Sequence, residues 1–363
     1  MRLSDNQKVF FELLRAGLWE TDVQLAPYGE VSFTVILALA QEQSVVGIVS
    51  AGLEHVTDVK IPQAVILQFV GQTLQIELRN KEMNAFFPGL MERLRATWVK
   101  ALVVKGPGVA QCYERPLWRT CGDLDLLLDV ENYEKAKALM APIADEVEVE
   151  NKRTLHQALK IKGMDVELHG RMPFLLSKRV DHVIDEALTD SLSKGGVTTL
   201  NVEGKEVFLP NADNHLFLVF THFLHHFFIE GVGLRHIQDW CRMLWTYKDS
   251  LDLDLLEKRI KKSGLMSEWR TFAAFAVSYL GMPREAMPFY QAGYEGRARK
   301  VLSLVIKSGN FGQNKDLSYR VKYKGATYKL VSFWRRFCDF TAFATIFPAD
   351  APRFFLTYLS EKI

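Results

Sequence analysis

The chain has 363 residues, of which 48% are hydrophobic and 24% charged, and its formal net charge is +2. This composition is typical of a globular protein and excludes a disordered chain. The small net charge argues against a protein that binds nucleic acid through its overall field.

The four cysteines include no Cys-x-x-Cys pair, so neither a zinc site nor a redox motif is indicated. Free thiols fit a reducing cytoplasm. The N-terminus lacks the apolar core of a signal peptide. The most apolar stretch, 31–53, is interrupted at 41–43, short of the roughly 20 uninterrupted residues that a membrane span needs. We expect a cytoplasmic protein without a transmembrane segment.

Residues 1–98 are predicted to form an N-terminal helical region. Ser4 or Asp5 can cap a first helix whose apolar positions follow the 3.6-residue period. Further helices are predicted at 31–41 and 44–53. The segment 61–95 suits one long helix or two shorter helices broken near Pro88.

Residues 99–210 alternate between strand and helix patterns and predict a mixed-sheet core, so the expected fold class is α+β. The predicted strands lie at 100–105, 123–129, 145–150, 155–161 and 164–169, with a hairpin at 197–209. The predicted helices lie at 107–115, 131–142 and 177–192. From 211 to 363 the chain becomes helical again, with helices expected at 216–229, 234–247, 253–263, 267–280 and 295–308.

Two aspartates alternate with leucines in the predicted strand at 123–129. Residues i and i+2 of a strand share a face, so Asp123 and Asp125 stand side by side while Leu124 and Leu126 turn into a core. Two carboxylates about 7 Å apart on one face repel each other and are costly to bury. A divalent cation such as Mg²⁺ would remove that cost. The simpler alternative is a solvated acidic strand edge.

A third carboxylate is expected from a later strand, where Asp165 and Glu167 share a face. It would complete a site for two ions, or for one ion and a base. Periodicity alone leaves both residues open.

The motifs between 100 and 170 resemble the nucleotidyltransferase superfamily, which has the DNA polymerase β fold, and within it the bacterial family known as uncharacterised nucleotidyltransferases. The resemblance is carried by a strand ending in Lys105-Gly106, then Tyr113, Pro116, Arg119, Gly122-Asp123-Leu124-Asp125 and Glu167-Leu168-His169. It implies a nucleotidyltransferase-fold sheet flanked by the two helical regions. It also favours Glu167 over Asp165 as the third metal ligand and catalytic carboxylate, with Asp123 and Asp125.

The resemblance also implies a nucleotide-binding set around these acids: Lys105, Gly106, Gly108, Arg119, Gly122 and His169. Lys105 could meet a phosphate or be solvated at a strand end. Arg119 could hold a phosphate or pair with an acid, and His169 could orient Glu167, touch substrate or be structural. The chain departs from many superfamily members by having Gly106-Pro107-Gly108 where they place a Gly-Ser pair. Backbone amides or Lys105 would then replace the serine hydroxyl.

A histidine-rich helix is predicted at 215–226, with His215, His222, His225 and His226 at spacings that place most of them on one side. A metal site and a cleft lining are both open, but interleaved phenylalanines favour helix packing. On the next helix, Arg235 and Asp239 are one turn apart, and a salt bridge between them is the simplest expectation. A contact with nucleotide or substrate is the alternative.

The segment Lys315–Arg336 carries seven basic residues against one acid, mixed with aromatic residues. It could bind an anionic partner such as nucleic acid, lipid headgroups or a sugar phosphate. A solvated basic face over an aromatic core is the simpler interpretation.

The sequence therefore predicts a nucleotidyltransferase that uses Mg²⁺ or Mn²⁺ to transfer a nucleoside monophosphate from a nucleoside triphosphate to an unidentified acceptor: a small molecule, a sugar, a protein or RNA. The alternative is a catalytically inactive protein that uses the same fold to bind nucleotides or a partner. The absence of the serine after Gly106 motivates that alternative.

Overall fold

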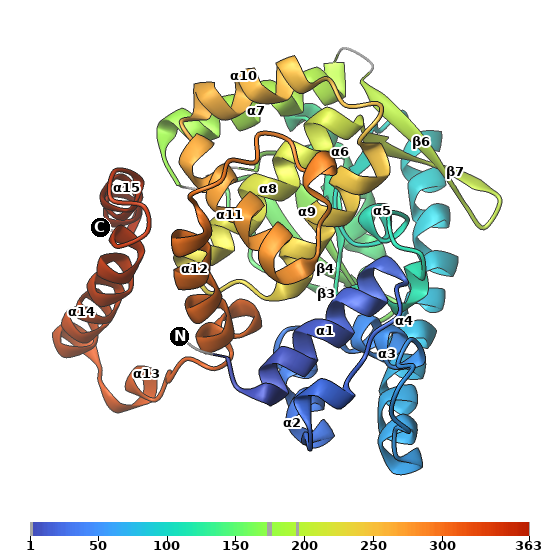
Figure 1. Ribbon diagram of the computed structural model, residues 1–363. Helices are drawn as coiled ribbons and strands as arrows, with labels where there is room; N and C mark the ends of the chain where they lie inside the picture. The colour runs from blue at the N-terminus through green and yellow to red at the C-terminus, as the bar shows by residue number, and fades with distance from the viewer. Residues whose placement is uncertain (1–2, 173–175, 194–195, 363) are drawn as a thin grey trace.

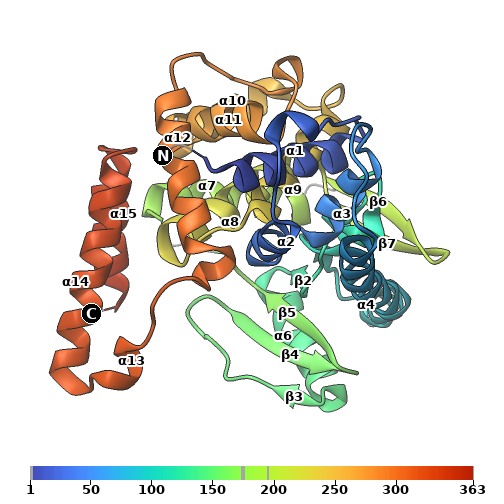
Figure 2. The ribbon, with the colours of Figure 1, turned by 60° about the horizontal axis from the view of Figure 1, so that its bottom comes forward.

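The computed structural model describes residues 3–172, 176–193 and 196–362. It contains a five-stranded mixed sheet that is flanked by helices from both ends of the chain (Figure 1), with the β3–β4 edge projecting from them (Figure 2). The spatial order of the strands is β1 (Leu102–Val103), β2 (Leu124–Leu127), β5 (Met164–His169), β4 (His156–Ile161) and β3 (Glu146–Val147). The α+β architecture with a mixed sheet and flanking helical regions is confirmed.

The pairing of β2 with β5 is parallel, and the other pairs in the sheet are antiparallel. The register places Asp125 beside Glu167. Two strands about 40 residues apart in sequence thus carry acidic residues at adjacent positions, because neighbouring strands lie only about 5 Å apart.

The N-terminal helices are α1 (Asp5–Trp19), α2 (Phe33–Glu42), α3 (Val46–Glu54) and α4 (Gln63–Ala96). Ser4 caps α1 through a capping box with Gln7, as its position suggests. The long predicted segment forms one helix, α4, which continues through Pro88. A proline removes one backbone hydrogen bond, but the surrounding turns are held by buried Phe87, Leu90 and Met91.

The core strands β1 and β3 are two residues each, shorter than predicted. The helix expected at 107–115 is only the short α5 (Pro107–Ala110), and a 3₁₀ turn follows at Pro116–Trp118. Proline disfavours the helical conformation of the residue before it, so a helix cannot run on through Arg115. The remaining core elements are α6 (Val130–Met140), α7 (Lys178–Ser193) and a separate hairpin of β6 (Val197–Val202) and β7 (Lys205–Pro210).

The C-terminal helices begin with α8 (Ala212–Ile229), α9 (Leu234–Tyr247), α10 (Leu253–Ser263), α11 (Met266–Leu280) and α12 (Glu295–Ser308). Three more follow beyond the last predicted element: α13 (Tyr319–Lys322), α14 (Gly325–Ala344) and α15 (Asp350–Lys362). Both ribbon views show these three at one side of the molecule, away from the sheet (Figures 1 and 2).

Two hydrophobic clusters cover the sheet. Leu124 and Leu126 enter a cluster with α4 and α6, as the alternation in β2 predicts. Leu127, on the other face, joins a larger cluster with residues of α1, α8 and α11. This larger cluster draws on all three predicted regions; their division at 98/99 and 210/211 stays a prediction.

Within the described residues, no helix is both long enough and apolar enough to span a bilayer. The four cysteines are free thiols, three of them buried.

The crossing of α1 and α3 requires a residue without a side chain. A Cβ atom on Gly52 would lie 1.9 Å from the backbone oxygen of Leu13. Gly52→Ala should therefore lower the free energy of unfolding by about 2–3 kcal/mol, because backbone must move to admit the methyl group. Urea denaturation followed by circular dichroism measures this.

Gly71→Ala is the matched control, because Gly71 is exposed on α4 and a Cβ there meets no atom within 4 Å. It should raise stability by about 0.5–1 kcal/mol through helix propensity. Equal stabilities of the two variants would contradict the assigned crossing.

Candidate active site

Three carboxylates converge where β2 and β5 lie side by side. Oxygens of Asp123, Asp125 and Glu167 all lie within 4.8 Å of one another. Asp125 is completely buried, and Glu167 is about one-third exposed. The spacing allows one cation to contact all three, as the alternation in the two strands predicted.

Asp125 is held by two nitrogen donors on one oxygen. Lys105 Nζ lies 2.6 Å and His169 Nε2 2.8 Å from Oδ1. The second oxygen, Oδ2, is buried and has no hydrogen-bond partner among the described residues. A buried carboxylate oxygen without a partner is costly, so this atom is suited to a ligand that the protein itself does not supply.

The pKa values of the acids reflect this crowding. The charge of Asp125, and next to it burial, raises the pKa of Asp123. Burial alone would raise the pKa of Asp125, but the nearby Lys105 and the hydrogen bond from His169 lower it overall. Burial likewise opposes ionisation of Glu167, yet hydrogen bonds from His156 and His169 lower its pKa. Two of the three acids are thus held as anions by neighbouring donors.

Glu167 rather than Asp165 belongs to the cluster. Glu167 Oε2 lies 3.2 Å from His156 Nε2 and 3.4 Å from His169 Nε2. Asp165 is exposed and forms an ion pair with Arg79 at 3.4 Å. Both acids do share a strand face, but only Glu167 lies close to Asp123 and Asp125.

Asp123 and Glu167 border a cavity of about 250 Å³ between the sheet and the helices α8 and α9, whereas the buried Asp125 is not part of its lining. Of the predicted residues, its walls include Lys105, Gly106, Arg119, Asp123, Glu167 and His169. The helices contribute His222, His225, His226, Arg235, His236 and Asp239, and Phe311 lies at the rim. One wall is acidic and the facing wall carries mainly nitrogen donors.

The predicted glycines have different surroundings. Gly106 has φ +54°, and a Cβ there would lie 2.7 Å from the Asp123 carbonyl oxygen, so the turn after β1 can approach β2 only with glycine. Gly108 packs against Leu209, and its N–H donates to the Lys105 carbonyl. Gly122 is exposed beside the cavity. A phosphate-binding role for these glycines stays a prediction.

Arg119 pairs with an acid, one of its two predicted alternatives. Its guanidinium donates to both oxygens of Asp239, at 3.0 and 2.5 Å, and Tyr113 donates to the same carboxylate at 2.8 Å. The expected Arg235–Asp239 salt bridge is therefore wrong. Asp239 turns toward the buried Arg119, whose two-pronged fork matches a carboxylate, and Arg235 instead donates to the Thr120 carbonyl at 3.1 Å.

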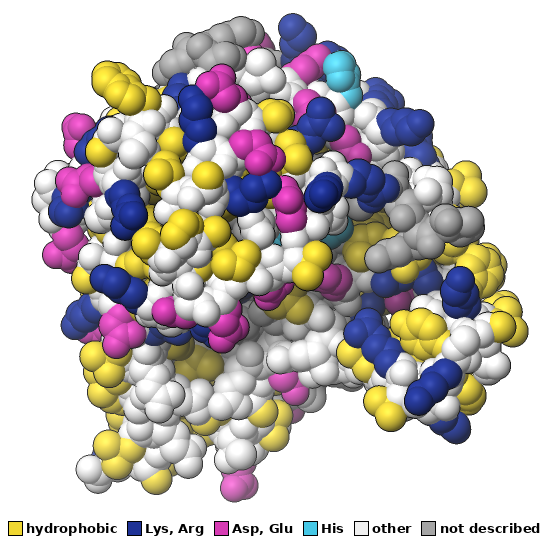
Figure 3. All heavy atoms as spheres, turned by 180° about the vertical axis from the view of Figure 1, so that it is seen from behind, with side chains coloured by type: hydrophobic (Ala, Val, Ile, Leu, Met, Phe, Trp, Pro, Cys, Tyr) yellow, Lys and Arg dark blue, Asp and Glu magenta, His cyan; other side chains and the backbone are white. Residues whose placement is uncertain are grey.

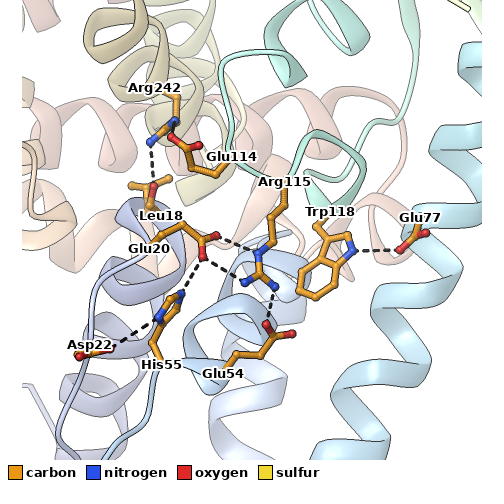
Figure 4. Close-up of polar contacts among 10 residues, drawn as sticks. All are labelled: Leu18, Glu20, Asp22, Glu54, His55, Glu77, Glu114, Arg115, Trp118 and Arg242. Carbon is orange, nitrogen blue, oxygen red and sulfur yellow. Dashed lines mark hydrogen bonds and ion pairs between the residues drawn. The ribbon is translucent and has the colours of Figure 1, made fainter.

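The segment that carries Tyr113, Arg115 and Arg119 is clamped between the helical regions (Figure 4). Arg115 donates to Glu20 at 2.9 Å and to Glu54 at 2.7 Å, and Trp118 donates to Glu77 at 3.0 Å. Arg242 of α9 donates to the Leu18 carbonyl and to Glu114 from the opposite side. These contacts fix the segment although it lacks long regular structure.

The histidines of the histidine-rich helix α8 lie in two different environments, the core and the cavity. His215 donates toward the Val104 carbonyl and serves the core, whereas His222 accepts from Lys105 at 3.1 Å. His226 lies 3.0 Å from His222 and 2.8 Å from Glu230. Phenylalanines of the same helix fill the core on its other side. Packing and cleft lining therefore coexist on one helix.

The basic segment Lys315–Arg336 includes α13 and much of α14. Figure 3 shows Lys and Arg side chains beside hydrophobic ones on the lobe at its lower right, where these helices lie. Val321 and Trp334 are 84% and 62% exposed, while Arg335 pairs with Asp316. An anionic partner for this segment stays a prediction.

Sequence reasoning missed His156, His236 and Phe311. His156 begins β4 directly opposite His169, so the strand pairing that brings it to Glu167 could have been used to find it. His236 lies in the segment 233–239, which resembles the family only weakly, and Phe311 carries no motif. Only the packing of α9 and of the turn after α12 brings the two to the cavity.

The acidic strand residues beside this cavity define a candidate cation site. A family described as uncharacterised nucleotidyltransferases matches residues 30–281. The chain belongs to this family, as the strand motifs predicted.

A search of solved structures matches an antigenic nucleotidyltransferase-like protein from Paracoccidioides brasiliensis. It is 16% identical, with 52% of this chain and 91% of that chain covered and a TM-score of 0.33. A likeness this weak carries no argument about function. No curated protein matches the chain.

The Arg119–Asp239 pair predicts a stability change. Both side chains are about 95% buried, so Asp239→Asn leaves a buried guanidinium without its counter-charge. The free energy of unfolding should fall by about 3–5 kcal/mol. Glu131→Gln is the control, since that acid is 78% exposed in its pair with Lys135, and it should cost less than about 1 kcal/mol. Similar costs in thermal or urea melts would contradict the buried pair.

Proposed function

We propose that the protein is a Mg²⁺- or Mn²⁺-dependent nucleotidyltransferase that moves a nucleoside monophosphate from a nucleoside triphosphate to an acceptor hydroxyl or phosphate. The observation that carries the proposal is the convergence of Asp123, Asp125 and Glu167 within 4.8 Å at the wall of a cavity. Family membership supports the reaction class.

The residues fit a divalent cation. Carboxylate oxygens are the ligands that Mg²⁺ prefers, and the buried, unpartnered Oδ2 of Asp125 is available to it. Asp123, with its pKa raised by the neighbouring charge of Asp125, would gain most from a cation. When bound, the metal would neutralise charge on the phosphates during in-line displacement.

The reaction forms a bond from the acceptor oxygen to the α-phosphorus and breaks the bond from that phosphorus to the β-phosphate oxygen, which leaves in pyrophosphate. When the acceptor is a hydroxyl, its O–H bond also breaks and the proton passes to solvent water. Glu167 is a weak base because its pKa is lowered, so we assign it to the metal rather than to the acceptor's proton. Lys105 and His169 both contact the same oxygen of Asp125. A cation on Asp125 would compete with the Lys105 ammonium, which could then contact a phosphate.

Asp123→Asn tests the metal assignment. Removing one ligand charge should lower nucleotide transfer at least about 100-fold, in proportion to losses seen for other electrostatic groups in active sites. Pyrophosphate release from each nucleoside triphosphate with Mg²⁺ or Mn²⁺ measures transfer, and the mass of the labelled product identifies the acceptor. Titration with Mn²⁺ alone should show weakened metal binding.

Asp165→Asn is the matched control, because it makes the same change on the neighbouring strand β5, outside the cluster. It should change transfer less than about threefold, since exposed ion pairs contribute little. Full activity of the double variant with Asn at 123 and 125 would eliminate the proposal. Tight nucleotide binding with no pyrophosphate release for any acceptor would instead favour the inactive nucleotide-binding alternative.

A further inference from the structure

Arg235 is a buried cation at the cavity wall without an acidic partner. Its side chain is 92% buried. Arg119 of the same wall is paired with Asp239, and Lys105 is paired with Asp125 unless a metal ion takes its place. Among the described residues, no carboxylate forms an ion pair with Arg235.

The contacts of Arg235 leave part of its donor capacity unused. Nη1 donates to the Thr120 carbonyl at 3.1 Å, and Nη2 lies 3.4 Å from His236 Nε2. Nε is buried and has no acceptor in the described part of the chain. A buried N–H that lacks an acceptor costs about 1–3 kcal/mol, and more when the group is charged.

His236 presents a second unused donor. An arginine can only donate, so His236 Nε2 accepts from Arg235 and the ring proton of the neutral imidazole resides on Nδ1. Burial, and next the charge of Arg235, lowers the pKa of His236 and keeps the ring neutral. Nδ1 is buried without a partner among the residues described. Adjacent residues thus hold two unsatisfied N–H groups.

The guanidinium of Arg235 lies next to the acidic cluster. A Cβ on Gly122, the residue before Asp123, would be 4.0 Å from Arg235 Nη1. Arg235 and His236 line the same cavity as Asp123 and Glu167. An anion in the cavity would face Asp123 and Glu167 on one side unless a cation bridged them. On the other side it would meet the residues Arg235 and His236.

We propose that Arg235 and His236 form a phosphate-binding site that holds the β- and γ-phosphates of the nucleoside triphosphate through Arg235 Nε–H and His236 Nδ1–H. This rests on the proposed function and names the part of the substrate that α9 recognises. The site performs the task that a serine hydroxyl after Gly106 would perform, and this chain has proline there. A guanidinium is well suited to a phosphate because its N–H groups donate charge-assisted hydrogen bonds.

Calorimetry with magnesium pyrophosphate tests the site without requiring turnover. Arg235→Gln should weaken pyrophosphate binding about 10- to 100-fold, the range expected for loss of charged hydrogen bonds. Arg235→Lys should give an intermediate loss, because charge is kept while the fork is lost. His236→Phe should weaken binding about 3- to 10-fold through one neutral donor.

Arg299→Gln is the matched control, since it removes the same charge from an exposed position on α12 outside the cavity. It should leave pyrophosphate affinity unchanged. Thermal melts check that each variant is folded at the temperature of the titration. Arg235→Lys keeps the experiment informative if Arg235→Gln does not fold.

The bound phosphate could belong to the nucleoside triphosphate or to a phosphorylated acceptor. Binding of a nucleoside monophosphate, which lacks the β- and γ-phosphates, is compared with binding of pyrophosphate to identify which phosphates the site holds. If the site holds the β- and γ-phosphates, Arg235→Gln and Arg235→Lys weaken binding of pyrophosphate and of an α,β-methylene triphosphate but leave monophosphate affinity unchanged. Wild-type affinity of a folded Arg235 variant for pyrophosphate would overturn the inference, and so would failure of the wild-type protein to bind it. A phosphate on the acceptor would then be the source if the same variant raised only the KM for a phosphorylated acceptor.

The outcomes separate this inference from the proposed function. Arg235-dependent pyrophosphate binding without transfer to any acceptor would keep the phosphate site and refute the transferase. Active transfer with pyrophosphate binding that ignores Arg235 would keep the transferase and refute the site.

Discussion

The candidate site depends on one constraint, the parallel pairing of β2 with β5. This register puts Asp125 of β2 beside Glu167 of β5, and it places His169, the last residue of β5, opposite Leu127. A buried carboxylate at Asp125 is tolerable only because Lys105 and His169 donate to it. A shift by one residue would turn Asp125 into the leucine cluster and the leucines toward the cavity, with a large desolvation cost.

The helical regions complete what the sheet begins. The sheet provides carboxylates and one lysine, whereas α8 and α9 provide the nitrogen donors of the facing wall. The segment between α5 and β2 joins the two, because Arg119 and Tyr113 converge on Asp239 of α9 while Arg115 pairs with Glu20 and Glu54 of the N-terminal helices. Each of these charged side chains would be costly to bury alone, and each is paired with a group of opposite charge from a distant part of the chain.

Strand alternation and helix period predicted the structure best where the environment of a residue depends on its neighbours in sequence. Alternation placed Asp123 and Asp125 against Leu124 and Leu126, and the two leucines do enter the core. Helix periods gave the central C-terminal helices nearly to the residue. Prediction failed where residues distant in sequence compete for the same partner. Asp239 is one turn from Arg235 but pairs with Arg119. The predicted helix at 107–115 ends at Ala110, and the conformation of the segment that follows is set by its ion pairs and by Pro116.

By itself, the sequence determined the family-bearing motifs, the α+β class and the candidate acids, because strand alternation and helix period act over a few neighbouring residues. Only the tertiary structure decided that Glu167 rather than Asp165 joins the aspartates, that His156 and His236 reach the site, and that Arg235 is left without an acid. Those outcomes depend on strand register and on helices packed from far along the chain. Which charged groups pair depends on their distance and burial in the folded structure, and these cannot be read from the neighbouring residues in the sequence.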